Sequence, residues 1–148
     1  MNGRAHATAS YALAPVTGVA VGLLLADLQT GVLAAAGCVA GVLLSPDLDQ
    51  ESITESESLV YRKGGNVLGH LWRAYWMLYA LVLPHRSVLS HGPLIGTAGR
   101  LAYLLAPWII WALAGGWIGD LVFTLYPFWP VALGLAVSDL AHWAMDQV

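Results

Sequence analysis

The chain has 148 residues, of which 58% are hydrophobic and only 10% are charged. Soluble domains carry roughly 25% charged residues, and the mean hydropathy here is +0.67, so the composition excludes an ordinary soluble domain. The formal net charge of −3 and the lack of a basic cluster argue against nucleic-acid binding.

Four long stretches without a charged residue predict an all-α, polytopic membrane helical bundle. They hold 18 to 22 residues each, and about 20 apolar residues are enough for a helix to cross a bilayer. With their flanking residues, they predict one membrane domain over residues 1–148 with about four transmembrane helices. The expected spans are roughly 5–26, 28–46, 92–116 and 120–145.

The first two predicted spans form an antiparallel hairpin, because only a short polar turn joins them. Gly18 and Gly22 stand four residues apart in the first span, as do Gly37 and Gly41 in the second. Glycines at this spacing leave one helix face without side chains and let two helix backbones approach closely.

The chain turns hydrophilic after the second span. Residues 47–69 are rich in glutamate and serine and end in a basic, glycine-containing run. We expect a mobile cytoplasmic loop here, and a flexible substrate lid is the alternative.

The next element, residues 70–83, is predicted to be an interfacial helix. Its uncharged part, 74–84, has 11 residues and is too short for a span. A fifth membrane crossing is the alternative. The element also carries aromatic residues of the kind that settle at the headgroup level: Trp72, Tyr75, Trp76 and Tyr79.

A polar cluster at 84–93 precedes the third span and contains two histidines, an arginine and two serines. Prolines at both ends and Gly92 disfavour a continuous helix, so His85 and His91 share a site more easily from a loop. Two histidines that share a site in this way can bind a metal ion together. Hydrogen bonding at the membrane interface is the alternative.

The last predicted span is interrupted by Pro127 and Pro130 and continues as a helix to about Met145. Pro130 suits a first helical turn. Asp139 and His142 are separated by three residues, and His142 and Asp146 by four, so all three project from one face. A carboxylate and an imidazole at this spacing are a common way for one helix to provide two metal ligands.

Short antiparallel connections place the polar residues on one face of the bundle. All six basic residues fall on that side, whereas the opposite loops carry only Asp27, Gln29 and Asp120. Basic residues are enriched on the cytoplasmic side of membrane proteins. We therefore expect the polar face at the cytoplasm.

Seven potential metal ligands converge on this face. One catalytic zinc ion needs three or four protein ligands, so we expect one or two divalent transition-metal ions, with zinc first and manganese or iron as alternatives. Two carboxylates as close as those of the Asp-x-Asp turn repel each other, and a cation relieves this. His70 is expected to play no part. The candidate ligands are His6, Asp47, Asp49, His85, His91, Asp139 and His142.

These residues follow a distinctive order: a histidine near the N-terminus, a Pro-Asp-x-Asp turn, a His-Arg-Ser-x-x-Ser-His loop and a closing Ser-Asp-x-x-His helix. The order resembles a family of small membrane proteins described as metal-binding proteins of unknown function. These are akin to the LexA-regulated, membrane-bound metal-dependent hydrolases and, more distantly, to the zinc-dependent phospholipase C group. The resemblance implies that the seven residues are ligands. We expect the protein to reside in a bacterial inner membrane.

The ligand set and the resemblance predict a membrane-embedded, metal-dependent hydrolase acting on a phosphoester of a lipid or lipid-linked substrate. Asp49 or Asp139 would accept the proton of the attacking water, and Arg86 would pair with a phosphate oxygen. A non-catalytic metal-binding subunit or sensor is the main alternative. A cation transporter is disfavoured, because the ligands gather at one face and not at the midplane. The sequence leaves homo-oligomer formation open.

Overall fold

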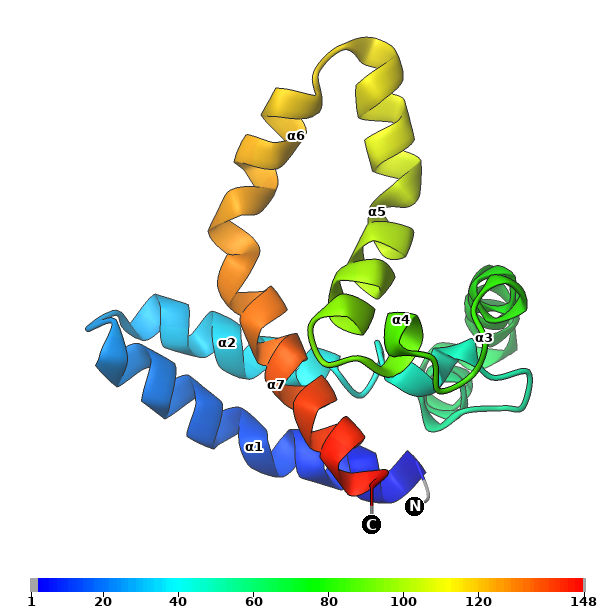
Figure 1. Ribbon diagram of the computed structural model, residues 1–148, viewed down its shortest axis with the longest axis horizontal. Helices are drawn as coiled ribbons and strands as arrows, with labels where there is room; N and C mark the ends of the chain where they lie inside the picture. The colour runs from blue at the N-terminus through cyan, green and yellow to red at the C-terminus, as the bar shows by residue number, and fades with distance from the viewer. Residues whose placement is uncertain (1–2, 148) are drawn as a thin grey trace.

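The computed structural model describes residues 3–147, and within this range it contains helices and no strand, which confirms the all-α class (Figure 1). The elements are α1 (Gly3–Leu24), α2 (Leu28–Ala40), η1 (Pro46–Asp49), α3 (Glu55–Val82), α4 (Val88–His91), α5 (Ile95–Gly115), α6 (Ile118–Leu125), η2 (Tyr126–Phe128) and α7 (Trp129–Met145).

Three helical segments are long and apolar enough to cross a membrane, namely Gly3–Leu24, Ile95–Gly115 and Ile118–Met145. Helix α2 is also apolar but has 13 residues, fewer than the about 20 that span a bilayer. The expected span at 28–46 therefore corresponds to a shorter helix followed by turns. Large apolar side chains along the long segments are exposed, which is typical of a surface that contacts lipid or a partner.

Glycines allow close helix packing, as their spacing predicted. A Cβ atom added at Gly18 of α1 would lie 3.1 Å from the carbonyl oxygen of Gly31 in α2. One added at Gly37 of α2 would overlap the carbonyl oxygen of Val131 in α7. Helix α2 thus packs against both α1 and α7 through backbone contacts, which fixes α7 next to the N-terminal hairpin.

Helix α3 consists of two arms that fold back on each other. The break is at Gly65, whose φ of 78° lies in the left-handed region that glycine tolerates. The indole N–H of Trp72 donates to the Ser56 hydroxyl at 3.2 Å. In a straight helix, residues this far apart would be separated by about 24 Å, so the contact requires the arms, 55–64 and 66–82, to lie side by side.

The expectation of a loop over 47–69 is wrong for residues 55–69, which are helical apart from the break. A capping box starts the first arm: the Thr54 hydroxyl accepts from the Glu57 N–H at 3.2 Å, and the Glu57 carboxylate accepts from the Thr54 N–H at 2.7 Å. This reciprocal pair satisfies two backbone donors at the helix start. The expected helix at 70–83 lies within the second arm; its position at the membrane interface stays a prediction.

The second arm of α3 packs against η1 and α5 through aromatic side chains. Trp76 and Tyr79 are buried with Leu48 of η1, and Tyr103 of α5 packs against them. The expectation that these two aromatic residues face lipid headgroups is wrong, because η1 and α5 cover them. This aromatic core holds η1 in place beside α4 and α5.

Two hairpins, α1–α2 and α5–α6, extend in different directions from one end of the molecule (Figure 1). At that end, the N-terminal part of α1 lies beside the C-terminal part of α7. Helices α4 and η1 contact each other in the same region. The polar residues of the chain meet here.

Candidate metal centre

Four segments supply histidines and aspartates to one continuous row of side chains. They are the N-terminal part of α1, η1, the segment that ends in α4, and the C-terminal end of α7. The structure brings together six of the seven candidate ligands expected from the sequence, and it adds one aspartate. The row consists of His6, Asp47, Asp49, His85, His91, His142 and Asp146.

The local structure of η1 directs its two aspartates to different neighbours. The Ser45 hydroxyl caps η1 by accepting from the Asp47 N–H at 3.3 Å, and Pro46 suits the first turn. With about three residues per turn in a 3-10 helix, side chains two positions apart point in different directions. Asp47 faces His142 and His91, whereas Asp49 faces His91 and His85.

Helix α4 holds His91 at its last position. Its N-cap is Ser87, whose hydroxyl accepts from the Ser90 N–H at 3.3 Å. His85 precedes this helix in a turn, so the two rings meet edge to face with centroids 5.1 Å apart. The pair therefore shares one site, as the cluster at 84–93 predicted.

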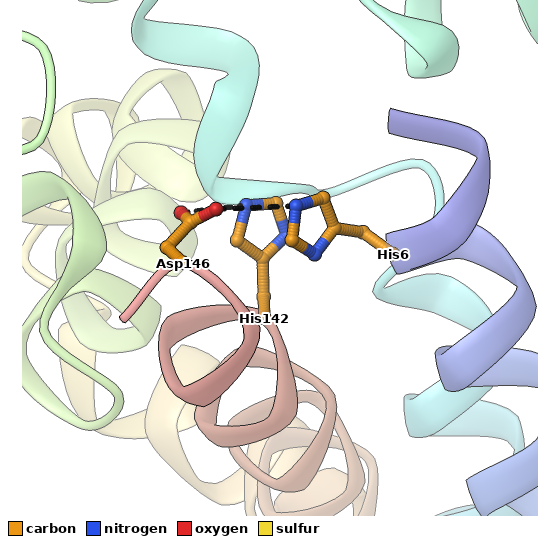
Figure 2. A group of neighbouring side chains, drawn as sticks. All are labelled: His6, His142 and Asp146. Atoms are coloured by element: carbon orange, nitrogen blue, oxygen red, sulfur yellow. Dashed lines mark ion pairs between the residues drawn. The ribbon is translucent and has the colours of Figure 1, made fainter. Parts of the chain in front are cut away.

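The first triad joins the two ends of the chain (Figure 2). The Asp146 carboxylate lies to one side of two imidazoles, with Oδ1 3.2 Å from His6 Nε2 and Oδ2 3.5 Å from His142 Nε2. The two rings stack with centroids 3.7 Å apart and an interplanar angle of 11°. Both histidines thus present a nitrogen to the same carboxylate.

A second triad continues the row from His142. Oδ1 of Asp47 lies 3.5 Å from His142 Nε2 and 3.9 Å from His91 Nε2. The third triad consists of His91, Asp49 and His85. Nδ1 of His91 lies 3.3 Å from Asp49 Oδ2, and Nδ1 of His85 lies 2.7 Å from Asp49 Oδ1. Because His142 and His91 each belong to two triads, neighbouring triads share a ligand.

Separations in the first two triads match metal ligation better than hydrogen bonding. Hydrogen bonds from N–H to oxygen usually span about 2.7–3.2 Å. Two ligands held about 2.0–2.1 Å from one tetrahedral zinc ion stand about 3.4 Å apart. Three of the four values, 3.5 to 3.9 Å, lie near that spacing and outside the hydrogen-bond range. The fourth, 3.2 Å between His6 and Asp146, fits both, and the 2.7 Å contact of His85 with Asp49 is a hydrogen bond.

Imidazole nitrogens that lack partners support the same conclusion. Nε2 of His91 and Nε2 of His142 are buried and have no hydrogen-bond partner within residues 3–147. A buried polar atom without a partner costs about 1–3 kcal/mol. A cation in the second triad would give both nitrogens a ligand bond, so the residues present fit a metal ion.

Carboxylates control the protonation of the row in the metal-free protein. Burial lowers the pKa of His91, but the carboxylates of Asp47 and Asp49 outweigh it and raise that pKa to about 9. Burial raises the pKa of Asp47, but the imidazoles of His142 and His91 outweigh it and hold that pKa well below its ordinary range. His91 is therefore protonated near neutral pH without metal, and a metal ion must displace this proton.

Asp139 occupies a different environment from the one expected. Its carboxylate forms a buried ion pair with Arg100 of α5 and accepts from the Thr97 hydroxyl. It joins none of the three triads found among the described residues. That Asp139 ligates a metal or accepts a proton stays a prediction, and an arginine already engages its carboxylate. His70, expected to play no part, contacts Tyr61 at 2.9 Å.

Arg86 lies at the edge of the row. Its side chain is exposed, its φ is 62°, and its backbone N–H donates to Asp49 Oδ2 at 3.3 Å. A left-handed conformation is uncommon for a residue other than glycine and often marks a functional site. Arg86, His91 and Asp146 line a cavity of about 530 Å³. A larger cavity of about 640 Å³ lies between α1 and α2 and contains none of these residues.

Asp146 is the row member absent from the candidate ligands. Its spacing of four residues from His142 was visible in the sequence and placed it on the same helix face. The stacking of His6 on His142 brings His6 to it. This contact depends on the packing of α1 against α7, which the spacing does not reveal.

The family model described as "Uncharacterized metal-binding protein (DUF2227)" matches residues 1–148. No curated protein and no solved structure matches the chain. The family description and the His/Asp row agree that metal binding is the chemistry of this chain.

Proposed function

The chain belongs to this family of metal-binding proteins, and we propose that it is a membrane-embedded, metal-dependent hydrolase. Its substrate is a phosphoester of a lipid or lipid-linked molecule, cleaved at the cytoplasmic face of a bacterial inner membrane. The observation that carries this proposal is the pair of overlapping triads centred on His142, with buried nitrogens at ligand-like separations. The resemblance of the motif order to the LexA-regulated membrane hydrolases supports the choice of reaction class.

The proposed arrangement has four membrane crossings, made by α1, by α2 with the turns after it, by α5, and by α6 with α7. Three of these are long and apolar enough to span a membrane. The metal row would then lie at the cytoplasmic surface. Cysteines replacing Lys63 and Ser87 should react with an impermeant label from the cytoplasm, and one replacing Gln29 only from outside. Labelling of positions 63 and 87 from opposite sides would contradict this topology.

A bound divalent metal, zinc being the expected one, supplies Lewis-acid catalysis that makes water a nucleophile near neutral pH and polarises a phosphoryl oxygen. The chain's own residues bind and orient the substrate. The cavity of about 530 Å³ beside the row is in the size range of small-molecule sites. At its edge, the exposed Arg86 guanidinium pairs with phosphate oxygens.

Asp49 and His85 form a second functional unit. Both Asp49 oxygens face imidazoles, and its side chain is fully buried, whereas the His85 side chain is 39% exposed. Asp49 accepts the hydrogen bond of His85 Nδ1, which leaves His85 Nε2 as the basic atom. We assign proton acceptance to His85 Nε2, with Asp49 orienting the ring, in place of the direct role for Asp49 predicted from the sequence.

A non-catalytic metal-binding subunit or sensor is the second candidate function. The rings of His6, His91 and His142 are buried, and a metal closed off by protein ligands is structural, whereas a catalytic one keeps an open position. The two functions therefore differ in whether the bound metal has a solvent ligand.

The test is hydrolysis by purified, metal-replete protein in lipid. We expect chelator-sensitive cleavage of an activated phosphodiester and of a phospholipid, restored by added zinc or manganese. Asp49→Asn should lower the rate by about 10²-fold, and His70→Ala, which lies outside the row, should leave it unchanged. No turnover, together with a metal that has no solvent ligand, would exclude the hydrolase and leave the binding function.

A further inference from the structure

Two cavities meet beside the metal row. The first, of about 530 Å³, is the one lined by Arg86, His91 and Asp146. The second, of about 550 Å³, lies between the start of α5 and α7. Val88, Gly92 and Pro93 line both. The cavities therefore adjoin, and the two together are called the groove here; the metal row lies beside the first.

One face of α7 lines the whole groove. Leu133, Ala136 and Leu140 line the second cavity, and Trp143 and Asp146 line the first. These positions are three or four residues apart and share a helix face. From the first of them to the last, the helix rises about 20 Å. The groove is therefore much longer than a phosphate group needs.

The two parts of the groove differ in chemistry. The second cavity is lined only by aliphatic residues, glycine and proline, and several of these side chains, including Val88, Leu94 and Leu140, are more than half exposed. The first cavity carries an arginine, a histidine and an aspartate. The apolar part also lies toward the middle of the Ile118–Met145 segment, which is apolar enough to cross a membrane. A molecule that fills both parts has a hydrocarbon tail and a polar head, and the exposed Arg86 guanidinium favours an anionic head.

We propose that this groove binds a lipid phosphoester, with one hydrocarbon chain between α5 and α7 and its phosphate held by Arg86 beside the metal row. The assignment rests on the proposed function and adds to it the part of the site that selects a lipid. The tail is held by burial of its methylene groups, each worth about 0.8 kcal/mol. A water-soluble phosphoester would occupy only the polar part.

The first experiment measures binding without catalysis. Purified protein without added metal is placed in phosphatidylcholine vesicles that contain phosphatidic acid or diacylglycerol with the same diazirine-bearing chain. Phosphatidic acid should label Ala136 and Leu140 about tenfold more than diacylglycerol does, and Arg86→Ala should remove the difference. Equal labelling by the two lipids would mean that only bulk lipid covers α7, and would overturn the proposal. Preferential labelling confined to the cavity between α1 and α2 would overturn it too.

The second experiment fills the groove. Ala136→Trp should lower phosphatidic acid labelling and hydrolysis about tenfold, the effect of losing about two buried methylene groups, with metal content and cleavage of a soluble activated phosphodiester unchanged. The matched control, Ala114→Trp, changes an exposed alanine near the end of α5 and should have no effect. If Ala136→Trp leaves phosphatidic acid labelling unchanged, the groove does not bind the lipid chain, but the protein can still be a hydrolase. If phosphatidic acid labels the groove more than diacylglycerol does but no phosphoester is hydrolysed, the hydrolase function is wrong and the lipid-binding groove stands.

Discussion

Two buried clusters of charged residues lie one turn apart on α7, and they are built differently. Asp139 faces Arg100, so one negative charge meets one positive charge. His142 belongs to the row, which has three carboxylates and four histidines and contains no lysine or arginine. The first cluster balances its charge internally, whereas the second does not.

This difference separates a structural role from a metal-binding role within one short motif. Burying a charge is costly unless it is paired or coordinates a metal. The Arg100 guanidinium already pairs with Asp139 and donates to the Ser90 carbonyl at 2.6 Å. In the row, the carboxylates of Asp47 and Asp146 lie 3.5 to 3.9 Å from Nε2 atoms of His91 and His142 that lack hydrogen-bond partners. We therefore propose that Asp139 serves packing and that His142 binds the metal.

The largest effect is expected from Asp139→Ala, which leaves the Arg100 guanidinium buried without a counter-charge. Breaking a buried ion pair on one side costs about 3–5 kcal/mol, and unfolding in detergent should show this loss with and without metal. The double variant Asp139→Leu with Arg100→Met should recover most of the stability, because apolar residues of similar size often replace such pairs without loss. A loss seen only in the metal-loaded protein would instead make Asp139 a ligand.

The next largest effect concerns metal affinity. His91→Ala removes a residue shared by two triads, and we expect the affinity for zinc to fall by more than the 10- to 100-fold typical of outer partners of a site. His85→Ala affects only the third triad and should have the smaller effect. His70→Ala is the control without effect. Equal zinc affinities of the His91→Ala and His70→Ala proteins would contradict the proposal that the row binds the metal.

The smallest effect is the pH dependence of stability. The pKa of His91 is raised to about 9 in the folded, metal-free protein, above the value of about 6.5 for an unperturbed histidine. Its stabilisation is therefore complete below about pH 6.5 and is lost as the pH rises through 9. The Tm of metal-free protein should fall over this range, whereas that of zinc-loaded protein should not, because the metal displaces the proton. If the Tm of metal-free His91→Ala falls with pH as much as that of the metal-free wild type, His91 is not the group responsible.

The convergence of the row was predictable because it follows from short connections between antiparallel helices. Four of its positions, His6, Asp47, His91 and His142, come from separate segments that each end at the same side. The capping box that begins with Thr54 was also visible as a Thr-x-x-Glu pattern, but the hydrophilic composition around it led to the prediction of a loop.

The partner of Asp139 was not predictable in the same way. Arg100 precedes it by 39 residues on another helix, and no periodicity or spacing relates the two. The position where α3 folds back on itself was not predictable either. The composition around Gly65 is compatible with a helix break, with a loop and with a flexible helix. Contacts between distant segments decide these features, and a local pattern contains no information about them.

The central claim is that the His/Asp row holds metal, and the most direct test is the metal content of purified protein. Wild-type protein, prepared in detergent with zinc supplied and excess removed, should retain at least one transition-metal ion per chain, and the double variant His91→Ala with His142→Ala should retain none. Retention of the same metal content by the double variant, or a wild-type protein that binds no metal under these conditions, would contradict the account.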